Sequence, residues 1–205
     1  MKVKSEVFNI DCIQGMKQYP DNYFELAIVD PPYRDENQPT KDMRKNGQMN
    51  SIKGRLNEEY FKQLYRVSKN QIIWGANNFQ LPQFMGFIVW EKLTIGENFT
   101  MSMAEIASLS SNLGTTSKIV RIAPQGNNND PRIHPTQKPI KLYKWILSKY
   151  AKAGDKILDT HLGSGSSRIA AYDMGFEFTG FELDEDYFKA SEKRFKQHID
   201  QLTLF

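Results

Sequence analysis

Short apolar runs alternate with amphipathic stretches along most of the chain. Period-two and continuous apolar runs predict strands near 7–10, 24–29, 72–74, 87–90, 104–109, 118–122, 156–158 and 178–181. Helical spacing predicts a brief helix after Asp11, helices around 60–65 and over 139–150, a helix stopped by Gly175, and a last helix capped by Asp184. Strands and helices that alternate in this way are typical of one α/β domain, here spanning 1–205.

Four of the predicted strands run directly into a carboxylate. These residues are Asp11, Asp30, Asp159 and Glu182. In open α/β sheets, ligands bind at the edge where the parallel strands have their carboxyl ends. The sequence therefore predicts a site at this edge.

A glycine-rich turn follows the third of these carboxylates. Gly163 and Gly165 allow a sharp turn from strand to helix and close approach of a ligand to the backbone. Glu182, about 20 positions after the turn, can accept both hydrogens of a ribose diol. Arg168 stands where a dinucleotide-binding fingerprint has its third glycine, which disfavours nicotinamide and flavin cofactors. The segment predicts a pocket for an adenosine-containing ligand, and the alternative is a turn that merely joins strand to helix.

The second constellation is Asp30-Pro31-Pro32-Tyr33. Two prolines stiffen the chain after the strand, so the Asp30 carboxylate and the Pro31 carbonyl can accept both hydrogens of an exocyclic amino group. Tyr33 offers an aromatic face to the attached ring. An aryl amine is a poor nucleophile, and hydrogen bonds that draw its nitrogen toward tetrahedral geometry restore its lone pair. The alternative is an ordinary proline turn with a surface tyrosine.

Composition and charge narrow the class of protein. The chain has 205 residues, of which 40% are hydrophobic, and this is enough for a substantial core. No apolar run approaches the roughly 18 residues that cross a bilayer, and the charged N-terminus lacks the pattern of a secretion signal, so we expect no membrane partner and a cytoplasmic protein. With Cys12 as the single cysteine, no internal disulfide and no metal site are expected.

The net charge of +3 is modest, but its distribution is uneven. The polar segment 34–57 is basic and reads as a loop, and the stretch 115–141 is basic as well. Such segments suit contact with phosphates, and the alternative is solvated surface loops. The candidate nucleic-acid-binding residues in the first segment are Arg34, Lys41, Arg44, Lys45, Lys53 and Arg55.

Three motifs together resemble the β class of amino-group DNA methyltransferases. They are Asp30-Pro31-Pro32-Tyr33, His134-Pro135-Thr136-Gln137-Lys138-Pro139 and the segment 159–167, and in that family the catalytic motif precedes the cofactor motif. The resemblance implies a class I (Rossmann-like) methyltransferase fold, circularly permuted, with a seven-stranded, mostly parallel sheet. The cofactor motif of this chain departs from the usual family pattern at Thr160-His161 and Ser166-Ser167.

The resemblance also implies S-adenosylmethionine as cofactor and a role for each site residue. Catalysis would belong to Asp30, Pro31, Pro32 and Tyr33. Asp159 and the glycine turn would line the methionine and ribose, Glu182 would hold the ribose hydroxyls, and Asp11 with Cys12 would contact the adenine. The implied cofactor-binding residues are Asp11, Cys12, Thr136, Gln137, Lys138, Asp159, Gly163, Ser164, Gly165, Ser166 and Glu182.

The substrate implied by the resemblance is double-stranded DNA. Asp30 favours methylation of adenine N6, with cytosine N4 as the near alternative, and the base would be flipped out and stacked on Tyr33. The short segment 110–133 is the candidate target-recognition region, which is small for this family. Two further functions stay open as alternatives, an RNA amino-group methyltransferase and an inactive nucleic-acid-binding subunit. The protein could also form a homodimer, as enzymes of this class often do.

Overall fold

The computed structural model describes residues 3–33, 36–37, 52–53, 58–124 and 132–202. Its main sheet has eight strands, one more than the seven implied by the resemblance, because a short strand after residue 117 extends the edge by pairing in parallel with its neighbour. In sheet order the strands are β1 (Ser5–Asn9), β10 (Glu177–Glu182), β9 (Lys156–Asp159), β2 (Phe24–Val29), β5 (Ser68–Trp74), β7 (Ala104–Leu109), β6 (Gly86–Glu91) and β8 (Lys118–Arg121).

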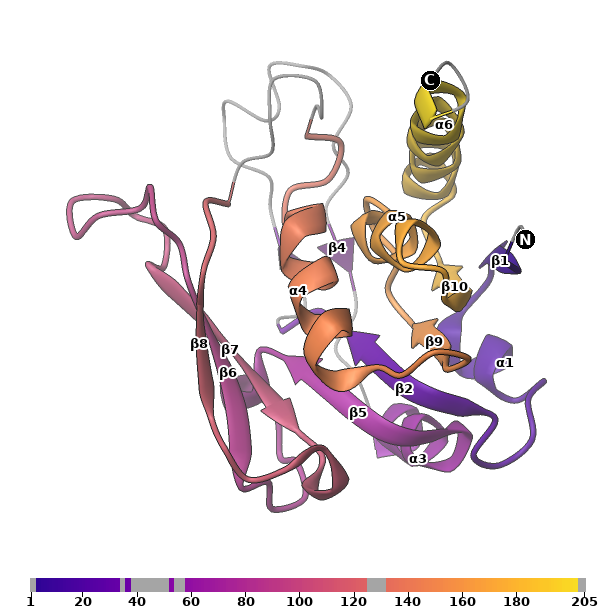
Figure 1. The fold of residues 1–205 in the computed structure, drawn as a ribbon, viewed down its shortest axis with the longest axis horizontal. Coiled ribbons are helices and arrows are strands. Elements are labelled where there is room, and N and C mark those ends of the chain that lie inside the picture. The colour runs from indigo at the N-terminus through magenta and orange to yellow at the C-terminus, as the bar shows by residue number, and fades with distance from the viewer. Residues whose placement is uncertain (1–2, 34–35, 38–51, 54–57, 125–131, 203–205) are drawn as a thin grey trace.

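Only β7 runs against its neighbours in this sheet. It pairs antiparallel with β5 and with β6, whereas the other neighbours pair in parallel. Strand β1 pairs with β10, so the first strand lies beside the last one, as Figure 1 shows by their indigo and orange ribbons. A separate two-stranded antiparallel sheet joins β3 (Glu36–Asn37) and β4 (Ile52–Lys53).

Helices cover both faces of the sheet. Helices α4 (Ile140–Tyr150) and α5 (Ser166–Asp173) pack together on one face, and α1 (Cys12–Met16) and α3 (Glu58–Val67) pack together on the other. Helix α6 (Glu185–Leu202) contacts β1, β10 and α5 (Figure 1). Two short 3-10 helices are η1 (Ala76–Asn78) and η2 (Ser111–Leu113). None of the helices in the described part of the chain is both long and apolar enough to cross a membrane.

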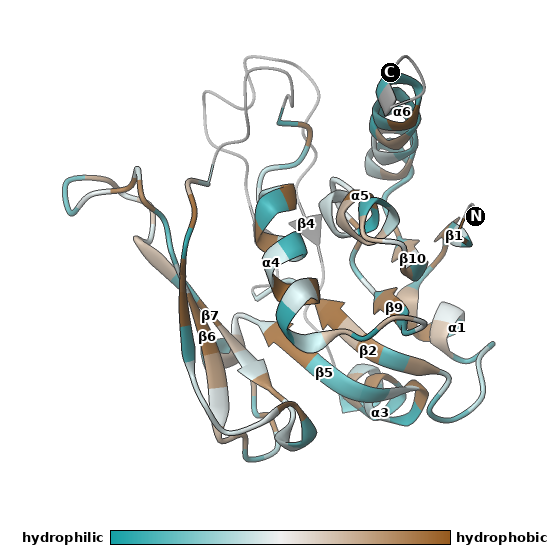
Figure 2. Cartoon of the chain, viewed as in Figure 1, coloured by the Kyte–Doolittle hydropathy of each residue, from teal (hydrophilic) through white to brown (hydrophobic). Residues whose placement is uncertain are grey.

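The apolar runs of the central strands have a simple physical reason. Along β2, Leu26 and Ile28 enter the core beneath α4 and α5, while Ala27 and Val29 enter the core beneath α1 and α3. Successive strand residues point to opposite faces, so a strand covered on both sides must be apolar throughout. In Figure 2 the hydrophobic colour accordingly gathers in the strands, and α6 is largely hydrophilic.

The predicted helix ends are confirmed. The Asp184 side chain accepts hydrogen bonds from the backbone nitrogens of Asp186 (2.9 Å) and Tyr187 (3.0 Å), which caps α6. Gly175 adopts a positive φ of 77° directly after α5 and allows the chain to turn into β10. These local signals fix the entry of the chain into the strands that carry the site.

Candidate active site

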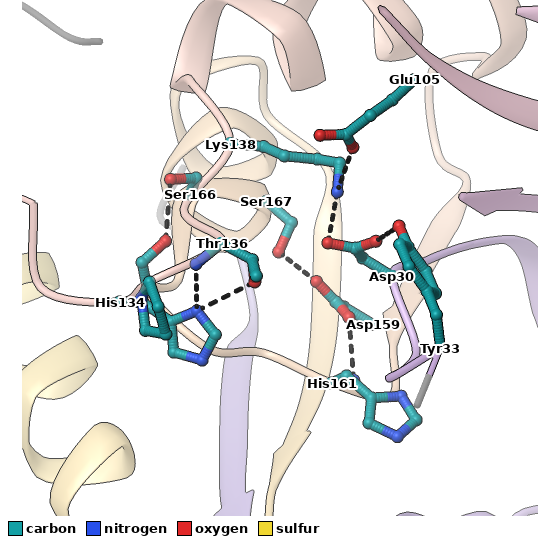
Figure 3. A network of polar contacts seen from close by, with 12 residues as sticks. Asp30, Tyr33, Glu105, His134, Thr136, Lys138, Asp159, His161, Ser166 and Ser167 are labelled. Carbon is teal, nitrogen blue, oxygen red and sulfur yellow. Dashed lines mark hydrogen bonds and ion pairs between the residues drawn. The ribbon is translucent and has the colours of Figure 1, made fainter. Parts of the chain in front are cut away.

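The sheet order brings the four predicted carboxylates to one edge. Strands β1, β10, β9 and β2 are neighbours, and Asp11, Glu182, Asp159 and Asp30 lie at or just after their carboxyl ends. Asp30 and Asp159 follow adjacent parallel strands, and Figure 3 shows their side chains next to each other. The proline motif and the glycine turn, which are more than 120 residues apart in the chain, therefore meet in space.

Both oxygens of the Asp30 carboxylate already have a partner. The Tyr33 hydroxyl donates a hydrogen bond to Oδ1 at 2.6 Å, and the Lys138 ammonium donates to Oδ2 (Figure 3). A carboxylate has about four acceptor positions, so with respect to the described part of the chain each oxygen keeps one for a ligand. Burial and the Asp30 charge raise the pKa of Tyr33, which keeps its hydroxyl protonated as a donor.

The Tyr33 ring packs against the backbone of a glycine that leaves room for it. Gly75 follows β5 with a positive φ of 67°, and a Cβ atom there would lie 2.1 Å from Tyr33 Cε1. On its other side the tyrosine ring meets Phe79 edge to face, with 6.0 Å between ring centroids. Gly75 was not among the site residues predicted from the sequence, although a glycine next to a strand can mark a point where another group comes close to the backbone.

Lys138 makes a second ion pair that the sequence did not predict. Its Nζ lies 3.1 Å from Oε2 of Glu105, and Nζ of Lys92 lies 2.6 Å from Oε1 of the same carboxylate. Burial alone would lower the pKa of Lys138, but Asp30 and Glu105 outweigh it and raise the pKa. The role of Lys138 in cofactor binding stays a prediction, and its ammonium group lies against Asp30.

The segment that precedes Lys138 is held together by polar contacts between its own residues. His134 Nδ1 lies 3.3 Å from the Thr136 nitrogen and 3.2 Å from its Oγ1, and Gln137 Oε1 accepts from the Ile133 nitrogen at 2.9 Å. Burial, followed by the charge of Lys138, lowers the pKa of His134 to about 3, so the ring is neutral. The same ring lies 3.4 Å from the position of a Cβ on Gly163, which places this segment against the glycine turn.

The glycine turn is tied to the end of the next strand. Gly163 and Gly165 have positive φ values of 52° and 73°. Glu182 Oε2 accepts from the Gly163 nitrogen at 2.7 Å, and Oε1 accepts from the Asp184 nitrogen at 2.9 Å. Counting partners among the described residues, both oxygens keep an acceptor position, as a ribose diol requires. Ser164 and Ser166 are buried, and their hydroxyls lie 3.1 Å from each other.

Asp159 is a buried carboxylate without a cationic partner in the described part of the chain. It accepts hydrogen bonds from Ser167 Oγ at 2.5 Å and from the His161 nitrogen at 3.0 Å. Burial raises the pKa of Asp159 to about 7, and the nearby charges of Asp30 and Glu182 add to this effect. This carboxylate would gain from a cationic ligand.

The fourth carboxylate lies beside a buried polar chain. Asp11 Oδ1 caps α1 by accepting from the backbone nitrogens of residues 13 and 14. Cys12 Sγ is 3.9 Å from His161 Nε2, and His161 Nδ1 is 2.9 Å from Thr160 Oγ1. Burial lowers the pKa of His161 to about 4 and raises that of Cys12 to about 12, so both are neutral. His161, which the sequence marked only as a departure from the usual cofactor motif, thus connects the glycine turn to Cys12.

The predicted DNA contacts fall where little can be described. Arg34, Lys41, Arg44, Lys45 and Arg55 lie outside the described residues, and Lys53 is described only as part of β4. Part of the segment 110–133 is described, namely η2, β8 and the residues next to them. Throughout the residues that the structure covers, no group of histidine, cysteine, aspartate and glutamate side chains could hold a metal ion.

The chain is similar to known methylases in sequence and in fold. A methylase of Escherichia coli (strain K12) that carries the name YubD is 26% identical over 210 residues, covering 90% of this chain and 87% of that protein. The structure of the M1.HpyAVI–SAM complex is similar with a TM-score of 0.62 and 19% identity, covering 92% of this chain and 98% of that one. The cytosine-N4-specific PvuII DNA methyltransferase has a TM-score of 0.67 and 12% identity, covering 97% and 92%.

These two structures confirm the class I methyltransferase fold. Residues 73–193, more than half of the chain, match the N6/N4 family described as DNA methylase. The matched part contains the glycine turn, Glu182 and the Lys138 segment. The chain therefore belongs to the N6/N4 DNA methylases, the amino-group DNA methyltransferases that act on adenine or cytosine.

Proposed function

We propose that this protein transfers a methyl group from S-adenosylmethionine to the N6 amino group of adenine in double-stranded DNA. The observation that carries the proposal is the position of the Asp30 carboxylate, which keeps acceptor capacity and lies beside Asp159 and the glycine turn. A group that binds an amine is thus next to a group suited to a cationic cofactor.

The residues of the glycine turn fit S-adenosylmethionine. Asp159 is buried with a raised pKa, and a sulfonium and an ammonium group would supply the positive charge that it lacks. Glu182 keeps one acceptor position on each oxygen for the ribose hydroxyls. When bound, the cofactor supplies an electrophilic methyl group. Thr136 and Gln137, in the segment against Gly163, are proposed to close over it, and Asp11 and Cys12 to contact its adenine.

Asp30 and the Pro31 carbonyl are proposed to receive the two hydrogens of the base amino group. Hydrogen bonds to both hydrogens draw the nitrogen out of conjugation with the ring and direct its lone pair toward the methyl group. Positioning of two reactants can supply roughly 7 to 11 kcal/mol of barrier reduction. The amino nitrogen would gain the methyl group as the bond between that group and the sulfonium sulfur breaks, and the proton that the nitrogen then loses would pass to the Asp30 carboxylate or to water. Tyr33 is proposed to stack on the flipped base while its hydroxyl keeps Asp30 oriented.

The choice of adenine rests on the aspartate. Relatives with an aspartate at the first position of this motif mostly act on adenine, and those with a serine more often act on cytosine N4. Asp30 supports adenine by this resemblance, and cytosine N4 is the second candidate because the PvuII enzyme shares the fold. The order of the motifs, with Asp30 before Gly163, and the pairing of β1 with β10 support the permuted β class.

Contact with DNA is proposed for the basic segment 34–57 and for the short segment 110–133. Six basic residues of the first segment would neutralise phosphates, and the second would contribute to target recognition. A homodimer would enlarge this limited recognition surface, and we keep it as part of the proposal.

The test is to express the protein in a host without DNA methylation and to sequence the genome for modified bases. We expect N6-methyladenine within a short recurring sequence, and no mark when Asp30→Ala is expressed instead. N4-methylcytosine would correct the base assignment. An unmodified genome, together with purified protein that binds DNA and does not methylate it or RNA, would identify an inactive subunit.

A further inference from the structure

The proposed amine acceptor, Asp30, is the last member of a row of four buried or partly buried charges that alternate in sign. Lys92 pairs with Glu105, Glu105 with Lys138, and Lys138 with Asp30. The Lys92 and Lys138 side chains are 7% and 3% exposed, and those of Glu105 and Asp30 are 25% and 13% exposed. The four residues come from four separate parts of the chain, next to or within β6, β7, α4 and β2.

Two tryptophan rings form an apolar surface on one side of these charges. Lys92 Nζ lies 5.2 Å from the centre of the Trp90 ring, and Lys138 Nζ lies 5.3 Å from the centre of the Trp74 ring. The two tryptophans are themselves almost fully buried and meet edge to face at 6.3 Å. Water is thus excluded from one side of the row, which strengthens the attraction between neighbouring charges.

A row of buried charges contributes little net free energy to folding. Removing a charge from water costs several kcal/mol, and apolar residues of the same volume often stabilise a protein as well as a buried ion pair does. The Glu105 Oε2 atom is buried and lies 3.1 Å from the Lys138 Nζ, but it accepts no hydrogen bond of good geometry from the residues that the structure describes. Glu105 therefore attracts the ammonium by charge while the lysine directs its hydrogen bond to Asp30.

We propose that Glu105 and Lys138 are positioning residues for Asp30, in which Glu105 anchors the lysine and Lys138, through its ion pair, holds the carboxylate turned toward the base. Asp30 is the amine acceptor only under the proposed function, so this inference rests on it. With Lys138 in place, the carboxylate can accept from the amine with one free position on each oxygen, and Tyr33 fixes its other side.

Other charged and titratable groups also face this row. They are Tyr33 from the proline motif, Arg132 and His134 from the segment before α4, Tyr143 from α4, and Asp159 from β9. His134 and both tyrosines are neutral near pH 7, so among the described side chains Lys138 is the cation in direct contact with Asp30.

The test compares Lys138→Met with Glu105→Gln and follows the pH dependence of kcat. Loss of the lysine removes the cation from Asp30 and leaves the Glu105 charge nearby, so the acidic limb should move up by about one pH unit or more, with kcat at pH 7 lowered at least tenfold. Loss of the Glu105 charge removes a repulsion, so the limb should move the other way, with a severalfold loss of kcat. Cofactor affinity should change less than threefold in both variants. A tenfold loss of cofactor affinity in Lys138→Met would assign the lysine to the cofactor, as the resemblance implies, and would overturn the proposal for this residue.

Two further variants separate positioning from a purely structural role. Lys138→Arg keeps the charge and should restore the acidic limb to its original pH. Glu91→Gln removes an exposed ion pair with Arg121 on the neighbouring strand and should leave kcat and its pH profile unchanged. Lower activity of Lys138→Met and Glu105→Gln at every pH, without opposite shifts, would overturn the proposal.

A readout without turnover covers the case in which a variant is unstable. The carboxyl carbon signal of Asp30 can be identified by its absence in Asp30→Ala and followed against pH in the unliganded protein. Uptake of the proton at higher pH in Lys138→Met supports the inference, and an unmoved titration overturns it. If Asp30→Ala itself keeps full activity, the proposed function fails instead, so the two failures are distinguishable.

Discussion

Asp30 and Asp159 end adjacent strands, yet the protein treats their charges in opposite ways. Asp30 is paired with the Lys138 ammonium and receives the Tyr33 hydroxyl. Within the described residues, Asp159 receives neutral donors alone, from Ser167 and His161, and burial raises its pKa to about 7. One carboxylate is compensated by the fold, whereas the other is left to be compensated by what binds.

This difference separates two tasks at one edge of the sheet. A carboxylate whose charge is already balanced by the fold needs no charge from a ligand, which suits a group that orients a neutral amine. An uncompensated one gains most from a cation, which suits a group that binds a sulfonium cofactor. Nearest neighbours in the sheet can therefore differ in chemistry because different side chains reach them from outside it.

The largest effect is expected from Asp30→Ala. Loss of the amine acceptor should lower kcat by about 10² to 10³-fold, the range found when a single transition-state hydrogen bond is removed. The affinity for S-adenosylmethionine, measured by calorimetry, should stay within about threefold, since Asp159 is untouched. Equal losses of kcat and cofactor affinity would abolish the distinction between the two carboxylates.

Asp159→Asn should show the reverse pattern. Without the negative charge, cofactor affinity should fall by about tenfold or more, the scale of a hydrogen bond to a charged group. The kcat value at saturating cofactor should fall much less than in Asp30→Ala. Unchanged affinity in this variant would mean that the cofactor does not use Asp159.

The pH dependence of cofactor binding sharpens the comparison further. Asp159 is half protonated near pH 7 in the free protein, and a bound cation favours the ionised form. Affinity should therefore rise with pH, by about tenfold from pH 6 to pH 8 if one such group is responsible. The rise should disappear in Asp159→Asn and persist in Asp30→Asn.

Gly75→Ala should have the smallest effect of the four. The added methyl group collides with the Tyr33 ring, so the ring must move away and its hydroxyl must leave Asp30. We expect about a fivefold loss of kcat and a loss of about 1 to 2 kcal/mol of stability from the positive φ. Gly154→Ala has a positive φ in open space and should reproduce the stability loss without the loss of kcat.

Much of the fold and part of the site were predictable because their signals are local. Each of the eight predicted strands is present, and Asp30 and the glycine turn each lie directly after one of them. Strand β5 begins at Ser68, earlier than predicted, because its first residues are polar and gain their place by pairing with β2. Such pairing is decided between strands and leaves little trace in the run itself.

The charge row could not be predicted in the same way. Glu105 lies opposite Trp90 in an antiparallel pair, and only the register of β6 with β7 directs it toward Lys138. Lys138 belongs to a motif whose family role led us to expect contact with the cofactor, and its contact with Asp30 depends on how the segment before α4 folds. Contacts that join three or four distant segments have no sequence spacing of their own.

The burial of Cys12 has a practical consequence. It is the single thiol of the chain, it is 8% exposed, and with a pKa of about 12 only about one molecule in 10⁴ carries a thiolate at pH 8. Maleimide reagents should therefore react slowly with the unaltered protein. A cysteine introduced at an exposed position such as Glu97 could then carry a fluorophore selectively, giving an optical probe of substrate docking without removal of the native residue.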